Sequence, residues 1–266
     1  MARTVAGGLK RLLAALGCLL LLGNALAQDE FDVMRGLLDR GLYNSAAQVN
    51  GPALLAAHPA DREARLLYSQ ALLLAGDLAT AREVFEPLMA QLENIAEPGE
   101  LNLAGLLLAS EGNLAAALPL LEHAWSISGS YVHAMDLARI AWQAYRLEEA
   151  VDAYLEASRT ARGQTQPWPW LNIGRIRLAE GRLDDAEHAF EQAIVVYETF
   201  DPGELLPSPA YVEAFYRLGT VFELRYAENG VAAELNSARA HYQSALTGDP
   251  NYGPALAALE RLGAGQ

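Results

Sequence analysis

One segment of the sequence recurs at nearly regular intervals, and this constrains the fold more than any other feature. In each copy an alanine is followed four residues later by a large apolar side chain and seven residues later by another apolar residue. The alanines are Ala81, Ala117, Ala150, Ala186 and Ala238, separated by steps of 36, 33, 36 and 52 residues. Because positions i, i+4 and i+7 share one face of an α-helix, each copy predicts a helix with a buried face. The longer last step indicates an insertion.

Small residues recur twelve positions before these alanines and complete the repeat. They are Ser69, Gly105, Ala138 and Gly174, with Gly219 in the fifth unit once its insertion is allowed for. The pattern resembles the tetratricopeptide repeat, a helix pair of about 34 residues. In that family the small residue is where the two helices of a pair approach most closely. The resemblance implies an all-α fold, a right-handed α-α superhelix of about five to six helix pairs plus a C-terminal capping helix.

Composition agrees with helical repeats, because the chain is 52% hydrophobic, with Ala and Leu predominant, and these residues favour helices. We expect one elongated domain, since a solenoid grows by adding units. An irregular N-terminal pair over 28–60 would contain a kink at Gly51-Pro52. Tetratricopeptide repeats would follow over 61–250, and a capping helix over 251–266. The expected regular pairs cover about 62–95, 98–128, 131–161, 167–199 and 209–247.

The first 27 residues carry the features of a signal peptide. The apolar run Leu12–Leu22 is followed by the A-x-A site Ala25–Ala27, which is where such a peptide is cleaved. Three basic residues precede the run: Arg3, Lys10 and Arg11. We therefore expect a mature chain that begins at Gln28 and is periplasmic or secreted.

Two other outcomes remain for this segment. Cys18 follows Ala15-Leu16-Gly17, which faintly resembles a lipoprotein box, so lipidation would give a membrane-anchored lipoprotein. An uncleaved anchor is disfavoured because the apolar stretch is shorter than the roughly 20 residues that span a bilayer. Without lipidation at Cys18 we expect no membrane association.

The chain is strongly acidic, with a formal net charge of −14, and removal of residues 1–27 takes it to −17. Such a surface repels phosphate backbones and anionic lipid headgroups. We therefore expect no nucleic-acid partner.

The sequence shows no constellation typical of catalysis or of cofactor or metal binding. The five histidines are not paired at helical spacing with one another or with cysteine, as a zinc site would require. No nucleophile elbow, phosphate-binding glycine loop or dinucleotide fingerprint is present. We expect no enzymatic activity, no catalytic residue, no cofactor and no metal. The alternative, an enzyme with its active site in the insertions between repeats, would have neither a recognisable nucleophile nor a set of metal ligands.

The resemblance places a concave groove along the first helix of each pair. Arg139 and Arg175 occupy the same groove position in consecutive units, and arginine beside aromatic residues is typical of binding hot spots. The candidate peptide-binding residues are Asn102, Arg139, Trp142, Trp168, Arg175 and Tyr216. Trp170 is expected in the core instead. Packing and intramolecular pairs between arginine and acidic residues are the favoured explanation of the same residues, and binding is the other.

These features predict a non-enzymatic, periplasmic scaffold or adaptor that binds a protein or peptide in the concave groove. The carboxylate clamp of some tetratricopeptide domains is not matched, because Lys10 is the only lysine in the chain. The alternative is a membrane-tethered assembly component associated with a pilus, a secretion system or polysaccharide export.

Overall fold

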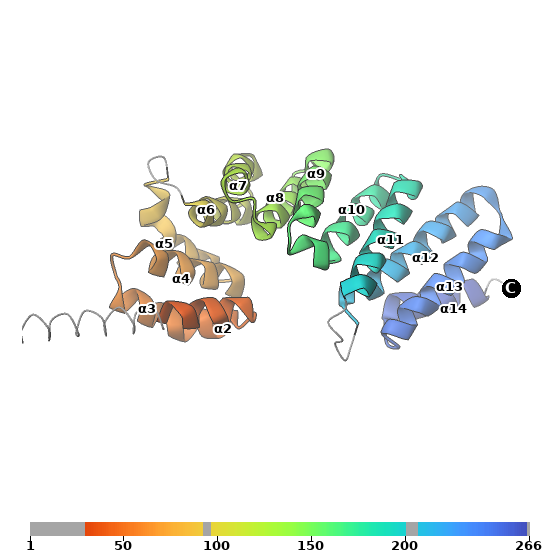
Figure 1. Ribbon diagram of the computed structural model, residues 1–266, viewed down its shortest axis with the longest axis horizontal. Coiled ribbons are helices and arrows are strands. Elements are labelled where there is room, and N and C mark those ends of the chain that lie inside the picture. Colours follow the sequence, from red (N-terminus) through yellow and green to blue (C-terminus); the bar gives the residue numbers. More distant parts are fainter. Residues whose placement is uncertain (1–29, 93–96, 201–206, 265–266) are drawn as a thin grey trace, which may run out of the picture. The chain divides into compact units, whose positions relative to one another are not determined.

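The computed structural model describes residues 30–92, 97–200 and 207–264, and within these ranges the chain is helical and contains no strand (Figure 1). The all-α prediction is confirmed. The chain forms two compact units, one ending at Gly112 and the other beginning at Asn113. The predicted signal peptide and Cys18 lie outside the described residues, and the predicted domain boundaries stay predictions.

The first unit begins with a helix over residues 30–39. The elements that follow are α2 (Tyr43–Ser45), the π-helical turn η1 (Ala46–Asn50), α3 (Gly51–Ala57), α4 (Arg62–Ala75), α5 (Leu78–Met89) and α6 (Pro98–Ser110). Helices α4 and α5 pack together as the first regular pair, which starts at Arg62 as the repeat predicts and ends at Met89, before the expected end near residue 95.

The irregularity expected at Gly51-Pro52 takes the form of the π-helical turn η1, which ends one residue before Gly51. Proline has no N–H and clashes with the preceding turn of an α-helix, and a π-turn alters that turn's hydrogen bonding. Gly51 has a packing role, because a Cβ there would lie 2.1 Å from Cδ2 of Tyr68. The missing side chain lets α3 contact the Tyr68 ring of α4.

The second unit is a series of helices in which each packs on the next (Figure 1). They are α7 (Leu114–Ser128), α8 (Tyr131–Gln143), α9 (Leu147–Arg159), α10 (Trp168–Ala179), α11 (Leu183–Phe200), α12 (Pro209–Asn229), α13 (Ala232–Gly248) and α14 (Gly253–Ala264), with a 3₁₀ turn η2 (Gly163–Thr165) before α10.

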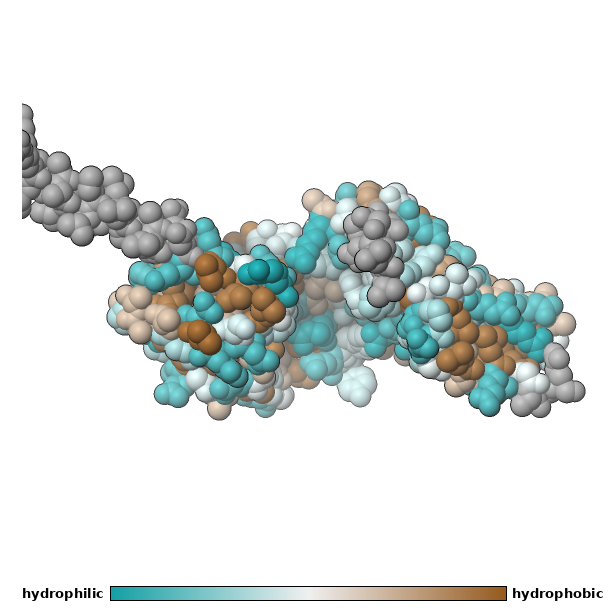
Figure 2. Space-filling model, turned by 90° about the horizontal axis from the view of Figure 1, so that it is seen from below, coloured by the Kyte–Doolittle hydropathy of each residue, from teal (hydrophilic) through white to brown (hydrophobic). Residues whose placement is uncertain are grey.

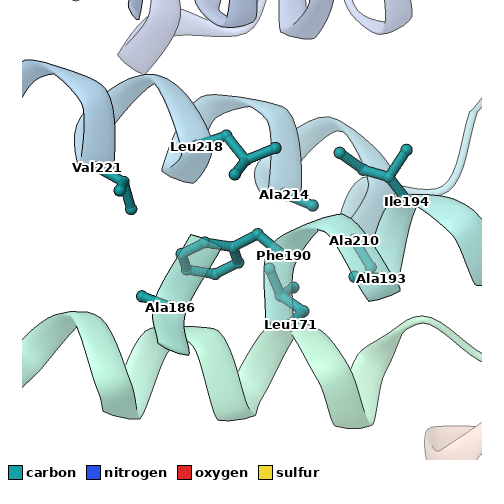
Figure 3. Packing of buried hydrophobic residues seen from close by; sticks show 9 residues of the cluster. All are labelled: Leu171, Ala186, Phe190, Ala193, Ile194, Ala210, Ala214, Leu218 and Val221. Atoms are coloured by element: carbon teal, nitrogen blue, oxygen red, sulfur yellow. The ribbon is translucent and has the colours of Figure 1, made fainter. Parts of the chain in front are cut away.

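The repeat positions form the core of the helix pairs. The five marker alanines are fully buried, and the large residues four positions later are at most 2% exposed. Figure 3 shows Phe190 of α11 between Leu171 of α10 and Leu218 of α12. A Cβ at Gly174 would lie 2.5 Å from the Phe190 ring, and one at Gly219 would lie 2.5 Å from the Tyr242 ring. In these two units the small residue is therefore where the paired helices meet.

The turns inside the pairs follow the predicted glycine pattern with one exception. Gly76, Gly112 and Gly181 have φ of 87°, 82° and 75°, values that glycine adopts without strain. The third unit has Tyr145 at this position, with φ of 58° and 88% of its surface exposed.

The fifth unit absorbs its insertion by lengthening both helices. Helix α12 has 21 residues and α13 has 17. The turn between them contains Gly230 with φ of 69°, as the Asn229-Gly230 pair predicts.

Helix α14 covers the end of the last pair, as predicted for a capping helix. Ala255 and Ala258 are buried against Tyr242 and Ala245 of α13. On the face seen in Figure 2, apolar side chains gather over α13 and α14, and Leu256 remains 47% exposed.

Candidate peptide-binding face

The first helices of three consecutive pairs, α8, α10 and α12, carry five of the six candidate residues, of which Trp168 stands at the start of α10. Arg139 and Trp142 lie on α8, Arg175 on α10 and Tyr216 on α12. We call the surface formed by these four residues with Glu213 and Arg217 the α8–α10–α12 face.

Arg175 links the three helices of this face. Its guanidinium carbon lies 5.1 Å from the centre of the Trp142 ring, within the range of a cation–π interaction. On the other side, its Nε lies 3.8 Å from Glu213 Oε1, and its Nη1 donates a hydrogen bond to Asn172 Oδ1 at 3.2 Å. The structure thus brings the predicted pair Trp142 and Arg175 together.

Arg139 is the more exposed of the two predicted arginines, with 51% of its side chain accessible. Its Nη2 donates to Asp136 Oδ1 at 3.2 Å. Burial raises the pKa of Tyr154 to about 12, and the positive charges of Arg139 and Arg175 oppose that rise. Both arginines therefore act electrostatically on the same buried phenol of α9.

Tyr216 lies in an aromatic cluster at the α12 side of the face. Its ring centre is 5.6 Å from that of Tyr242 and 5.6 Å from that of Tyr252. The guanidinium carbon of Arg217 lies 5.5 Å from the Tyr216 ring centre, and Arg217 Nη2 donates to Glu213 Oε1 at 2.9 Å. Sequence reasoning missed Arg217, although its spacing of four residues from Glu213 is typical of a helical ion pair.

Trp168 and Asn102 are not joined to this cluster. Trp168 begins α10 and is 36% exposed, and it makes no ring or cation–π contact with the described residues. Asn102 belongs to α6 of the first unit and is 8% exposed. Trp170 packs against the Phe190 core cluster, as predicted, with its ring edge-on to His188.

The face is locally cationic in an acidic protein. Arg139, Arg175 and Arg217 lie beside Asp136 and Glu213, whereas the whole chain has a net charge of −14. Guanidinium groups of this kind bind carboxylates through directed hydrogen bonds. The face can therefore hold a carboxylate, with Trp142 and Tyr216 providing apolar area.

Two properties of the described chain bear on other kinds of site. No three His, Cys, Asp or Glu side chains of the described ranges converge in a way that would hold a metal ion. Among the helices that the structure describes, none combines the length and the apolar character needed to cross a bilayer.

The fold defines a helical-repeat protein, and its first helices carry the candidate face. A family model for the tetratricopeptide repeat matches residues 169–197, which contain α10 and most of α11. This segment is therefore identified as a tetratricopeptide repeat, and the other described helix pairs repeat its buried positions. No curated protein matches the sequence significantly.

Several solved structures share the fold at low sequence identity. PilW, described as a widely conserved type IV pilus biogenesis factor, aligns with a TM-score of 0.67 and 13% identity over 88% of this chain and 98% of its own. YrrB, described as a TPR protein with an unusual peptide-binding site, aligns with a TM-score of 0.54 and 18% identity, over 80% of this chain and 99% of its own. A chain of the APC/C hetero-tetramer Cut9-Hcn1 aligns with a TM-score of 0.61 and 15% identity over 89% of this chain. The alignment covers only 42% of that longer chain.

Proposed function

We propose that this protein is an exported, non-enzymatic scaffold that binds a protein or peptide partner through a carboxylate held on the α8–α10–α12 face. The observation that carries the proposal is the position of Arg175 over Trp142. A stacked guanidinium is held in one orientation, so it loses less conformational freedom when it binds a ligand.

The arginines of this face keep capacity for a ligand. A guanidinium has five N–H donors, whereas the Arg175 Nε to Glu213 distance of 3.8 Å is longer than a hydrogen bond. Arg175 and Arg139 are 38% and 51% exposed. A partner carboxylate can therefore approach both groups from solvent.

The test is capture of partners from an envelope extract by the wild type and by the Arg139→Ala plus Arg175→Ala variant. We expect the double variant to lose capture while helical content and melting temperature stay nearly unchanged, because neither side chain is buried. The matched control is Arg40→Ala plus Arg82→Ala, which removes the same charge from the first unit, where Arg40 is exposed and the Arg82 side chain is 34% exposed. Persisting capture, or unfolding of the double variant, would show that the two arginines are structural.

Export rests on the cleavage motif at Ala25–Ala27. We expect the purified protein to begin at Gln28, which the mass of the intact chain from an envelope fraction will establish. A chain that retains residues 18–27 with added acyl mass would contradict cleavage there.

A membrane-tethered assembly component, associated with a pilus, a secretion system or polysaccharide export, is the second candidate. It is favoured by the alignment with PilW over 88% of this chain and 98% of that one, a likeness of fold. A lipid on Cys18 is the distinguishing observation, because it would tether the chain and replace the free N-terminus at Gln28.

A further inference from the structure

A second recess in the second unit differs from the α8–α10–α12 face in position and in charge. It has a volume of about 540 Å³ and lies along α7 and α9, which are second helices of their pairs. From α7, Leu118, Glu122 and Trp125 line it at positions i, i+4 and i+7. This spacing places the three side chains along one helical stripe. We call the recess the acidic groove.

The opposite wall of the acidic groove is a second stripe, on α9. Glu149, Asp152 and Glu156 line it at positions i, i+3 and i+7, with an arginine beyond each end, Arg146 and Arg159. These arginines are 13 residues apart, which corresponds to a length of roughly 20 Å along a helix. The groove is therefore long enough for several residues of a bound segment.

The lining between the stripes is apolar but incompletely covered. Leu118 and Ala153 are buried, whereas Trp125, Leu137 and Leu155 are only half-buried. Tryptophan in a recess is a frequent energetic anchor of protein interfaces. An apolar side chain that covers this lining would gain free energy from the area removed from water.

The charges of the groove determine which kind of segment can cover it. Arg146 pairs with Glu149, and Arg159 pairs with Glu156. Glu122 on α7 and Asp152 on α9 form no ion pair or hydrogen bond with any residue that the structure describes. A neutral or acidic occupant would remove water from these two carboxylates without replacing it, which is costly. A cationic side chain between them would compensate both.

We propose that the acidic groove binds a basic amphipathic segment of a protein partner, with an apolar residue on Trp125 and Leu137 and an arginine or lysine between Glu122 and Asp152. This surface is separate from the proposed carboxylate site. A scaffold with both would hold an acidic group on one set of helices and a basic segment on another.

The probe for this site is a short fluorescein-labelled peptide in which leucine and arginine repeat at helical spacing. Its binding to the full mature chain is measured by fluorescence anisotropy at low and at physiological salt. We expect saturable binding by the wild type. We expect the Glu122→Gln plus Asp152→Asn variant to bind about tenfold more weakly or worse. The reason is that the loss of a close charge pair at an interface changes the dissociation constant by a factor of about ten or more.

The matched control is Glu83→Gln plus Glu191→Gln, which removes two exposed carboxylates that lie outside the groove and have no partner among the described residues. This control and the Arg139→Ala plus Arg175→Ala variant should bind the probe as the wild type does. An equal loss in the control would show general attraction to an acidic protein and overturn the proposal. Absence of wild-type binding, or equal binding of a peptide with glutamate in place of arginine, would also overturn it. None of these three results bears on the proposed carboxylate site.

Discussion

The close approach of α10 and α11 at Gly174 leads to a quantitative prediction. A Cβ on residue 174 would lie 2.5 Å from Cε1 and 2.6 Å from Cδ1 of Phe190, whereas carbon atoms in contact are about 3.5–4.0 Å apart. Phe190 is fully buried among Leu171, Leu218 and their neighbours, so it cannot move by the required ångström without disturbing the core. Such overpacking costs about 1–3 kcal/mol.

Gly174→Ala also removes a glycine from a helix, which contributes up to about 1 kcal/mol in the opposite direction. The single variant should therefore lose about 0–2 kcal/mol. In a Phe190→Leu background the steric conflict is gone, and the same change should become neutral or stabilising. The expected coupling energy between the two positions is about 1–3 kcal/mol.

The assay is urea unfolding followed by circular dichroism for the four proteins of this cycle. Gly36→Ala is the control, because the nearest atom its Cβ would meet is Arg40 Nη2 at 3.8 Å, and it should not destabilise. A coupling energy near zero would mean that Gly174 and Phe190 do not pack as described. The larger change Gly174→Leu should lower the melting temperature in the wild-type background, whereas Glu149→Leu at an exposed position should have little effect.

Three further predictions concern other residues. Tyr145→Gly should raise the free energy of unfolding by about 1 kcal/mol, because φ of 58° strains a non-glycine residue. Tyr145→Ala keeps the backbone strain and should not raise it. Equal effects of the two changes in urea unfolding would refute this prediction. His241 of α13 stacks 5.1 Å from Phe222, and burial lowers its pKa below the ordinary 6.5. The unfolded chain then binds a proton before the folded one, so stability should fall as pH drops below about 6.5, and His241→Phe should flatten that part of the melting-temperature profile; an unchanged slope would contradict the assignment. Glu100 is 2% exposed and accepts two hydrogen bonds from Arg62, at 2.6 and 2.9 Å. Arg62→Met should lower the free energy of unfolding by about 3 kcal/mol, because it leaves this carboxylate buried without its ion-pair partner. Adding Glu100→Leu should restore most of that stability. If the double variant stays as unstable as the single one, the loss comes from packing of the Arg62 side chain and not from the ion pair.

The helix register could be predicted from the sequence because packing sets it locally. Each marker alanine, the large residue after it and the small residue before it satisfy one helix–helix contact, and the same contact recurs in every unit. The glycine turns follow for the same reason, since a backbone with positive φ selects glycine. The positive φ of Tyr145 could not be predicted, because the third unit keeps the turn but has a tyrosine where the other turns have glycine.

The candidate face was only partly predictable. The groove positions of the resemblance identified Trp142 and Arg175, but the contact between them depends on rotamers that no sequence pattern fixes. Arg217 was missed because it lies one residue beyond Tyr216, outside those positions. The stacking of His241 on Phe215 and Phe222 was also not predicted, because no repeat position includes this histidine.

The acidic groove also escaped sequence reasoning, because its charged residues read individually as solvated helix surface. Only the packing of α7 and α9 against α8 shows that the two stripes border one apolar recess.

The carboxylate site on the α8–α10–α12 face is tested most directly by an equilibrium binding measurement with paired peptides. One pool carries aspartate, glutamate and a free C-terminus, and the other carries asparagine, glutamine and a C-terminal amide. The first pool should bind the wild type at least about tenfold more tightly, a difference of about 1.4 kcal/mol, and the preference should vanish in the Arg139→Ala plus Arg175→Ala variant. Equal affinity for both pools, or a preference that survives loss of both arginines, would contradict a carboxylate site at Arg139 and Arg175.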